Sequence, residues 1–450
     1  MRFHTCTFVL LVAAVAAAAV LCIPQPLVAA SAACLTQGRP LRIVDRKDVV
    51  IDGFCPDGKS GHSGKRNAPF SILVKNARRV TIKNLSLTVD ARADSAVTIV
   101  NAGDVVIENN QFRGGKKGKA LILIRSVDGG TVDNITIRDN TFTDSPAVAI
   151  VVDSWKFNPQ RKIENIVIER NRFEKIFQAV RFVQSAAYSQ AANRPRNIRI
   201  VDNTLKAIDH VGILAIWGGG DRSEIADNIL EDICRDTDKK CNAVSCEYCD
   251  GGSITGNRIS TVGNCAGCRG DGAGIILDWE HKDPKYLTTN VTVSRNRIDG
   301  CRHALGGGGI ILWKADHTAV FSNQISDSRI GIILSNPETT DNLVYNNDVR
   351  SSDAGIQLKQ KTGNNAIYNN QVVENRMDVT DASGKGRNAI TNNYYQTCEG
   401  CDNQANIQSR QRFTADRCSG GKIDGRERRP FTDIAGKRPS RRPIGAEDCP

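Results

Sequence analysis

The hydrophobic and polar residues of this chain follow a phrase that recurs along most of its length. The phrase is a run of alternating β-branched residues, a polar pair ending in Asn, one further residue, and an aromatic or aliphatic side chain. Clear copies are Val105–Phe112, Ile135–Phe142, Ile166–Phe173 and Ile198–Leu205. Because apolar side chains at every second position are typical of a strand with one buried face, each copy predicts a strand followed by a turn.

The Asn residues of this phrase recur at a short period. They are Asn110, Asn140, Asn171, Asn203, Asn228, Asn257, Asn296, Asn323, Asn347, Asn370 and Asn393. The last three intervals are 24, 23 and 23 residues, and inserted loops stretch earlier intervals to as many as 39. Val80–Leu87 is a degenerate first copy, with Leu85 in place of Asn. Such periods indicate a solenoid, in which each unit buries its apolar face only against its neighbours.

A buried Asn at the same turn of every coil has a physical purpose. Its side-chain amide can bond to the same Asn one coil along, which satisfies buried polar groups in series. Leucine-rich repeats share this period, but their Leu spacing is absent here. The sequence therefore predicts an all-β protein, a single-stranded right-handed parallel β-helix of about 11–12 coils. At about 4.8 Å per coil, the solenoid would be roughly 55 Å long.

The first 33 residues have the features of an export signal. Arg2 gives a positive start, Phe8–Leu21 is an uncharged apolar run, and Leu27–Ala33 offers small residues for signal peptidase. The run is too short to span a bilayer comfortably, and no later segment is apolar enough. We expect a secreted or periplasmic protein without a membrane span. Ser31 stands where a lipoprotein signal carries Leu, which argues against lipid attachment at Cys34.

The rest of the chain divides into three predicted segments. Residues 34–79 hold an N-terminal cap and the first strands, residues 80–397 the β-helix, and residues 398–450 a basic extension with further cysteines. The net charge of +11 and the pI near 9.0 favour an acidic polymer as partner. Scattered basic residues and the export signal argue against nucleic-acid binding. We expect a monomer.

Cysteine usage agrees with export. The chain has 15 cysteines, of which Cys6 and Cys22 leave with the signal. Pairs spaced as C-x-x-C are common zinc ligands, but none has a convincing His partner, and oxidising compartments favour disulfides. The disulfide candidates are Cys34, Cys55, Cys234, Cys241, Cys246, Cys249, Cys265, Cys268, Cys301, Cys398, Cys401, Cys418 and Cys449.

A second strand with the shape G-I-x-L follows many Asn phrases. It occurs at Gly274–Leu277, Gly309–Leu312, Gly331–Leu334 and Gly355–Leu358. From Val49 to Asn393 the chain thus resembles the right-handed β-helix superfamily of pectate lyases, alginate epimerases and related carbohydrate-active proteins. The Asp-Pro-His-Asp motif of alginate epimerases and the Asp-Asp and Gly-His-Gly motifs of polygalacturonases are absent. The resemblance therefore indicates the fold more strongly than the activity.

In the enzymes of this superfamily the substrate lies along one sheet, so we aligned the G-I-x-L strands. With Ile332 and Leu334 inward, the residue after each Leu position should point to solvent. That row contains Ile216, Glu247, Asp278, Trp313, Ser335 and Lys359. Like charges on adjacent strands are unfavourable, so Glu247 and Asp278 indicate catalysis or a Ca²⁺ site unless they simply splay into water. A register shift by one residue would turn the pair inward.

The next row contains Trp217, Tyr248 and Trp279, which form either a sugar platform or a buried aromatic corner, and the second is favoured. Trp313 is the better residue to stack on a sugar. Loops inserted before the second strand should stack into a wall beside the carboxylate row, which holds Arg269, Arg302 and His303 for substrate binding. His281, in an insertion at the opposite end of the Asp278 strand, and Lys314, which follows in the aromatic row, are the candidate bases.

These residues suit two kinds of enzyme and one kind of binding protein. A lyase or C5-epimerase of acidic polysaccharides needs a base (His281 or Lys314), an acid, and a group that neutralises the uronate, such as Arg269, Lys359 or a bound Ca²⁺. A glycoside hydrolase would use Glu247 and Asp278 as its carboxyl pair. The third alternative is a surface protein whose β-helix binds glycans without turnover, or serves as a rigid spacer. The fold itself does not decide between them.

Overall fold

The structure is a computed structural model. It describes residues 41–53, 62–63, 70–89, 94–117, 119–153, 162–183, 194–218, 222–235, 241–263, 272–278, 287–302, 307–384, 387–395 and 398–399. These residues form strands and turns, and no helix among them could cross a membrane. The predicted signal peptide and most of the basic extension lie outside the described residues.

Each coil contributes strands to three faces of a solenoid, and all paired strands are parallel. The first face is the 13-stranded sheet formed by the strands that precede the Asn turn. Its strands are β2 (Lys47–Asp52), β5 (Arg78–Lys83), β8 (Gly103–Glu108), β11 (Thr131–Arg138), β13 (Lys162–Glu169), β15 (Arg196–Val201), β18 (Glu224–Ala226), β21 (Ser253–Thr255), β25 (Thr292–Ser294), β29 (Ala319–Phe321), β32 (Leu343–Tyr345), β35 (Ala366–Tyr368) and β38 (Ala389–Thr391).

The second face consists of the short strands that follow the Asn turn. They are β3 (His62–Ser63), β6 (Ser86–Val89), β9 (Gln111–Gly114), the first halves of β12 (Thr141–Asp153) and β14 (Arg172–Phe182), β16 (Thr204–Ile208), β19 (Ile229–Ile233), β22 (Arg258–Val262), β26 (Arg297–Asp299), β30 (Gln324–Ser326), β33 (Asp348–Arg350), β36 (Gln371–Val373) and β39 (Tyr394–Tyr395).

The third face carries the G-I-x-L strands. It contains β1 (Leu41–Val44), β4 (Phe70–Lys75), β7 (Ser95–Val100), β10 (Ala120–Arg125), the second halves of β12 and β14, β17 (Ile213–Ala215), β20 (Asn242–Glu247), β23 (Ala273–Asp278), β27 (Gly308–Trp313), β31 (Ile330–Ser335), β34 (Ala354–Leu358), β37 (Met377–Asp381) and β40 (Cys398–Glu399). A small separate pair is formed by β24 (Thr288–Thr289) and β28 (Ala315–Asp316).

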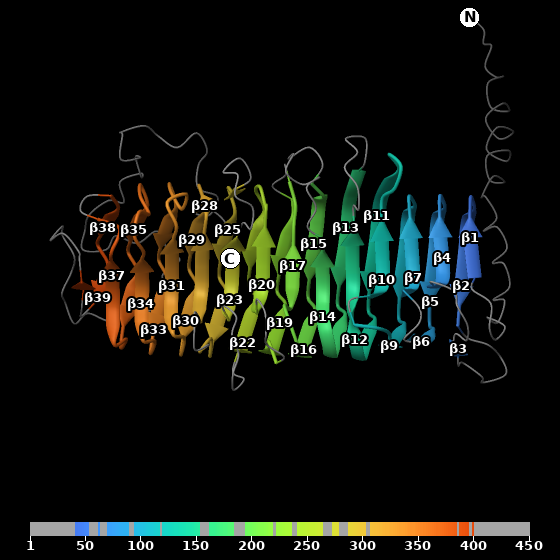
Figure 1. Ribbon diagram of the computed structural model, residues 1–450, viewed down its shortest axis with the longest axis horizontal. Coiled ribbons are helices and arrows are strands. Elements are labelled where there is room, and N and C mark those ends of the chain that lie inside the picture. The colour runs from blue at the N-terminus through green and yellow to red at the C-terminus, as the bar shows by residue number, and fades with distance from the viewer. Residues whose placement is uncertain are drawn as a thin grey trace, which may run out of the picture.

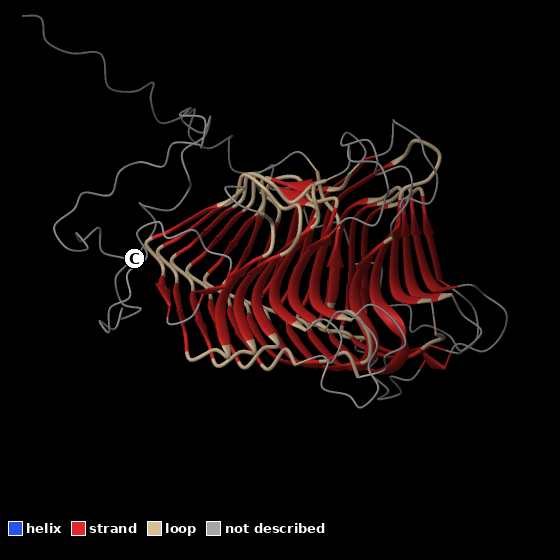
Figure 2. Cartoon of the chain, turned by 60° about the vertical axis from the view of Figure 1, so that its left-hand side comes forward, coloured by secondary structure: helices blue, strands red, loops and turns tan. Residues whose placement is uncertain are grey.

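The coils stack in chain order along the long axis of the molecule, from the blue N-terminal strands to the orange C-terminal strands (Figure 1). Figure 2 shows the same strands turning together from one face to the next. The predicted all-β parallel β-helix is confirmed. The first face has 13 strands, one more than the copies of the phrase, because Lys47–Asp52 already pairs with Arg78–Lys83 as an additional coil.

The Asn residues form the expected ladder through the interior. All eleven are buried, and in the first ten Nδ2 donates to Oδ1 of the Asn on the following coil at 2.9–3.1 Å. The last, Asn393, donates to the carbonyl oxygen of Ile367. The backbone N–H of Leu85 donates to Asn110 Oδ1 at 3.0 Å, so the degenerate copy closes the ladder at that end.

The first member of each polar pair makes the turn. The residue immediately before every ladder Asn has a φ between 51° and 69°, from Asn109 to Asn392. Asn and Asp tolerate this left-handed conformation better than other residues with a side chain, which explains why they are frequent at this position.

The glycine that begins each G-I-x-L strand is required by lack of space. A Cβ placed on Gly331 would lie 2.2 Å from Val349 Cγ1 and 2.6 Å from the carbonyl oxygen of Gly355. The corner between the second and third faces therefore has no room for a side chain. The next residues inward, such as Ile332 and Leu334, complete the core. Phe112, Phe142 and Phe173 stack in that core with ring centroids 4.8 and 4.9 Å apart.

We predict that Asn323→Ala lowers the free energy of unfolding by about 3 kcal/mol or more, because it leaves several buried groups without their hydrogen bonds. Asn323 donates to the carbonyl oxygens of Val293 and Phe321 and to Asn347 Oδ1. The matched control is Gln324→Ala, one residue later on the exposed side, where we expect a change within about 0.5 kcal/mol. Urea unfolding followed by circular dichroism measures both, and equal midpoints would contradict the ladder's role.

Candidate functional site

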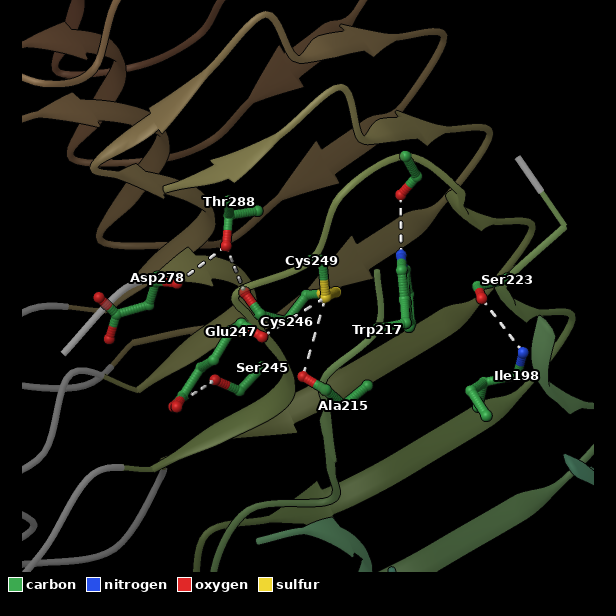
Figure 3. The surroundings of a disulfide bond; sticks show 11 residues. Ile198, Ala215, Trp217, Ser223, Ser245, Cys246, Glu247, Cys249, Asp278 and Thr288 are labelled. Carbon is green, nitrogen blue, oxygen red and sulfur yellow. Dashed lines mark hydrogen bonds between the residues drawn. A yellow bond between two sulfur atoms is a disulfide. The ribbon is translucent and has the colours of Figure 1, made fainter. Parts of the chain in front are cut away.

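The third face places the predicted carboxyl pair in one row. Glu247 and Asp278 are directly opposite each other in the register of β20 and β23. The preceding residues, Cys246 and Leu277, belong to the core, so the two carboxyl groups lie on the outer side of the sheet. In Figure 3 both side chains extend to the same side, away from the Cys246–Cys249 disulfide. The predicted alternation and register are therefore correct at this position.

The prediction that this pair faces solvent is wrong. Glu247 is 2% exposed and Asp278 is 6% exposed. Nearby on the same outer side, Ala273, Ile276, Ile311 and Ile333 form a buried cluster outside the main core. Other parts of the chain therefore cover this stretch of the third face. Strand alternation determines the direction of a side chain, but not what lies above it.

Trp313 continues the row into solvent. It is opposite Ser335 in the register of β27 and β31, and its side chain is 40% exposed. Apart from Ile229 on the second face, it is the one large hydrophobic residue exposed in the described part of the chain. An exposed indole on a strand that is otherwise buried offers a flat apolar surface with an N–H donor at one edge.

Short polar contacts hold the backbone around the pair. The Ser245 hydroxyl donates to Glu247 Oε1 at 3.3 Å. The Thr288 hydroxyl lies 3.0 Å from the carbonyl oxygen of Asp278 and 3.4 Å from that of Cys246 (Figure 3). Thr288, in β24, thus lies within hydrogen-bond distance of the ends of both carboxyl-bearing strands.

Two disulfides brace the coils on this side. Cys246 and Cys249 are joined across the turn after β20, with Cα atoms 5.9 Å apart. Cys234 and Cys241 are joined at the base of the insertion before β20, with Cα atoms 5.3 Å apart. Cys246–Cys249 is one of the C-x-x-C pairs, so disulfide formation rather than zinc binding is confirmed there.

The assignment of Cys301 to a disulfide is wrong. Its thiol is free and buried behind the third face, 3.3 Å from the position that a Cβ on Gly274 would take. Cys301, two residues after β26, turns into the corner of the core. Only the backbone of Cys398 is described. The candidates outside the described residues are Cys34, Cys55, Cys265, Cys268, Cys401, Cys418 and Cys449.

The aromatic row is a buried corner, as favoured by the sequence. Trp217 is fully buried, and its Nε1 donates to the carbonyl oxygen of Gly251 at 2.8 Å. Tyr248 is buried, and the Arg194 guanidinium lies 5.9 Å from the centre of its ring. Burial lowers the pKa of Arg194. Trp279 lies outside the described residues.

The remaining predicted site residues that the structure describes lie at two different ends of the third-face strands. Lys314 follows Trp313 in a turn with a φ of 57°, and Lys359 is exposed just after β34. Arg302 precedes β27, at the opposite end of that strand from Trp313, and its hydrogen bond with Asp327 raises its pKa. The structure therefore does not bring Arg302 to the Trp313 end of the row. His281, Arg269 and His303 lie outside the described residues.

A calcium ion would need more ligands than are seen. In the part of the chain that the structure describes, no three His, Cys, Asp or Glu side chains are grouped closely enough to share a metal. Ca²⁺ takes about six to eight oxygen ligands. Glu247 and Asp278 would supply only part of such a set.

We predict that Cys301 resists alkylation in the folded protein and reacts only after unfolding. Burial raises the pKa of its thiol to about 12. An unfolded cysteine titrates near pH 8.5, so from there to about pH 12 rising pH favours the unfolded state, which alone releases the proton. Iodoacetamide labelling at pH 8.5 with peptide mass spectrometry measures this, with Cys301→Ala as the control. Labelling of Cys301 in the native protein would contradict its burial.

Comparisons with known proteins agree with this geometry. Residues 70–235 match the family described as "Right handed beta helix region", and residues 233–411 match "Periplasmic copper-binding protein (NosD)". The sequence matches no curated protein.

Three solved structures illustrate the likeness. The mannuronan C-5 epimerase AlgE6 A-module of Azotobacter vinelandii is 12% identical with a TM-score of 0.48, covering 74% of this chain and 87% of its own. The surface adhesin PfbA of Streptococcus pneumoniae is 12% identical with a TM-score of 0.41, covering 74% and 82%. The tailspike of E. coli bacteriophage HK620, in complex with a pentasaccharide, is 10% identical with a TM-score of 0.42, covering 81% and 67%.

Likenesses this distant say nothing about what this chain binds. The stacked parallel strands and the family match over residues 70–235 establish the architecture by themselves. The chain has the fold of a right-handed parallel β-helix, and residues 70–235 match the family of that description.

Proposed function

We propose that this protein is an exported β-helix that acts on an acidic polysaccharide lying along its third face. The observation that carries the proposal is the exposed Trp313 side chain in the same outward row as the adjacent Glu247 and Asp278. Carbohydrate sites commonly combine an aromatic surface with a few polar groups. The net charge of +11 favours an anionic chain over a neutral one.

The proposed chemistry is abstraction of the proton α to a uronate carboxylate. In a lyase, loss of this proton is followed by cleavage of the C4–O4 bond. In an epimerase, a proton returns from the other side of the ring. Two carboxyl groups on directly opposite residues of adjacent strands suit a division of acid and base roles. Glu247 and Asp278 then supply an acceptor and a donor, and Lys314 or His281 serves as an alternative base. Lys359 or Arg269 neutralises the uronate.

Two alternatives have specific support. The carboxyl pair on adjacent strands also suits a glycoside hydrolase, in which two carboxyl groups flank the scissile bond. The burial of both groups instead favours a protein that binds glycans through Trp313 without turnover. The products separate the three functions, because a lyase forms an ultraviolet-absorbing unsaturated uronate, a hydrolase only new reducing ends, and a binder neither.

Copper chemistry has no support from the described residues. Copper sites are built mainly from His, Cys and Met. In the matched segment, Cys234, Cys241, Cys246 and Cys249 are disulfide-bonded and Cys301 is buried. His317 contacts Asp316 on an exposed turn. Since the described part of the chain groups no three metal-binding side chains, its residues do not fit a copper centre.

We predict that Trp313→Ala weakens binding of an acidic polysaccharide about tenfold, because stacking on a sugar contributes about 1–2 kcal/mol. Trp313→Phe keeps an aromatic face and should retain most of the affinity. Affinity electrophoresis in polyuronate gels and in neutral glycan gels measures both variants. Equal mobility of wild type and Trp313→Ala would exclude this residue from the binding site.

We further predict that Asp278→Asn abolishes turnover while leaving the fold intact, since Asn has nearly the same shape. Ultraviolet absorbance, reducing ends and proton exchange at C5 should be followed for wild type, Asp278→Asn and Glu247→Gln on polyuronates. Melting temperatures report on folding. Unchanged turnover in Asp278→Asn would refute its catalytic role, and retention without any product in wild type would establish the binding alternative.

A further inference from the structure

A second polar cluster lies on the outer side of the third face, nearer the N-terminus. Arg125 ends β10, and Asp153 is directly opposite it at the end of β12. Arg125 Nε and Nη2 donate to the same oxygen, Asp153 Oδ2, at 3.0 and 2.7 Å. The other carboxylate oxygen, Oδ1, is buried and has no hydrogen-bond partner. The Asp153 side chain is only 3% exposed, whereas that of Arg125 is 35% exposed.

The lone oxygen is unusual because a buried carboxylate oxygen without a partner is costly. The Arg125 guanidinium still has donors to offer, since the two bonds to Asp153 use two of its five N–H groups. Arg181, opposite Val151 in the neighbouring row, makes no ion pair in the described part of the chain. Arg181 is therefore one strand along from Asp153 and two residues back, on the same outer side of the sheet. With Arg125 and Asp153 it gives this part of the face a net charge of +1.

Apolar residues flank this cluster. Leu123 and Val151 are opposite each other two positions earlier on the same strands, and Val183 is close to them on the third strand. They pack together outside the main core, with Leu123 and Val183 only partly buried. A sugar ring has an apolar face and a polar rim, so an apolar patch beside charged hydrogen-bonding groups suits it.

We infer that Arg125, Arg181 and Asp153 form a subsite for one uronic acid unit of a glycan. The guanidinium groups bind the carboxylate of that unit, because Arg matches a carboxylate in shape and charge. Asp153 Oδ1 accepts a hydrogen bond from a neighbouring hydroxyl, and Asp153 Oδ2 positions Arg125. This inference rests on the proposed binding of an acidic polysaccharide, and it adds the group that recognises the acid.

The position of the subsite also sets the length of the ligand. Arg125 lies in the same outward row as Trp313, six strands earlier on the third face, which is about 29 Å at the usual strand spacing. One sugar unit of an extended chain is similar in length to one strand spacing. A glycan that contacts both Arg125 and Trp313 must also pass over the covered stretch at Glu247 and Asp278, so it has at least about six units.

The test is binding of acidic oligosaccharides of increasing length by isothermal titration calorimetry. For wild type, affinity should rise until about six units and then level off. Arg125→Ala should weaken binding of the long chains at least tenfold, and Asp153→Asn less, because Asn retains a carbonyl acceptor for Arg125. The matched control is Arg138→Ala on the first face. Arg138 makes the same two bonds, at 2.9 and 2.7 Å, to one oxygen of Glu108, with a 40% exposed side chain.

A carboxyl-reduced version of the same glycan identifies the group that Arg125 recognises. On this neutral ligand, wild type and Arg125→Ala should bind alike. Arg125→Lys, which keeps the charge but not the planar fork, checks the result if Arg125→Ala proves unstable, and should also lose affinity. Wild type that binds no acidic glycan would overturn the proposed function and this inference together. Wild type that binds while Arg125→Ala behaves like Arg138→Ala would overturn the subsite alone.

Discussion

The structure depends on the bonding of one buried amide to the next. Between the two ends, every ladder Asn donates through Nδ2 to the following Asn and to the backbone, and accepts through Oδ1 from the preceding Asn, as Asn323 does. A shift of one coil by a single residue would bury these groups without partners, at a cost that no apolar contact offsets. The ladder therefore determines the register of the strands on either side of it. The segments between successive ladder Asn residues can differ in length, which is why the coils tolerate insertions.

A fixed register turns each position of the coil into a row of side chains. On the first face, the outward row alternates in sign from Asp52 to Lys83 and from Glu108 to Arg138, and these residues form ion pairs with each other. Such a row satisfies its own charges and requires no ligand. On the third face, Glu247 is opposite Asp278, and Trp313 is exposed. The first face, whose charges are paired, is a solvent-exposed surface, whereas the third face, with its acidic pair and exposed Trp313, has the features of a binding surface.

The sequence predicted those parts of the fold in which the same residue has the same physical role on every coil. The Asn phrase located the whole ladder and the strand before it, because a buried amide is needed on every coil. A second ladder, from Asn342 to Asn365 and Asn388, was missed, since it spans only the last coils and lies outside the phrase. Burial could not be predicted, because it depends on segments that the repeat does not contain. For the same reason Glu247 and Asp278 were placed correctly on a face but wrongly in solvent.

The Arg125 and Asp153 cluster was missed for a related reason. Strands β12 and β14 run through both the second and third faces and lack the G-I-x-L shape, so aligning that shape began the row at Ile216. The row in fact begins earlier. Near its N-terminal end Arg125 is paired with Asp153, whereas further along Glu247 is opposite Asp278. A polyanion lying along such a row gains most where the cations are, away from the acidic pair. If this face binds an acidic chain, binding energy and chemistry therefore come from different coils, and the ladder holds those coils at a fixed distance.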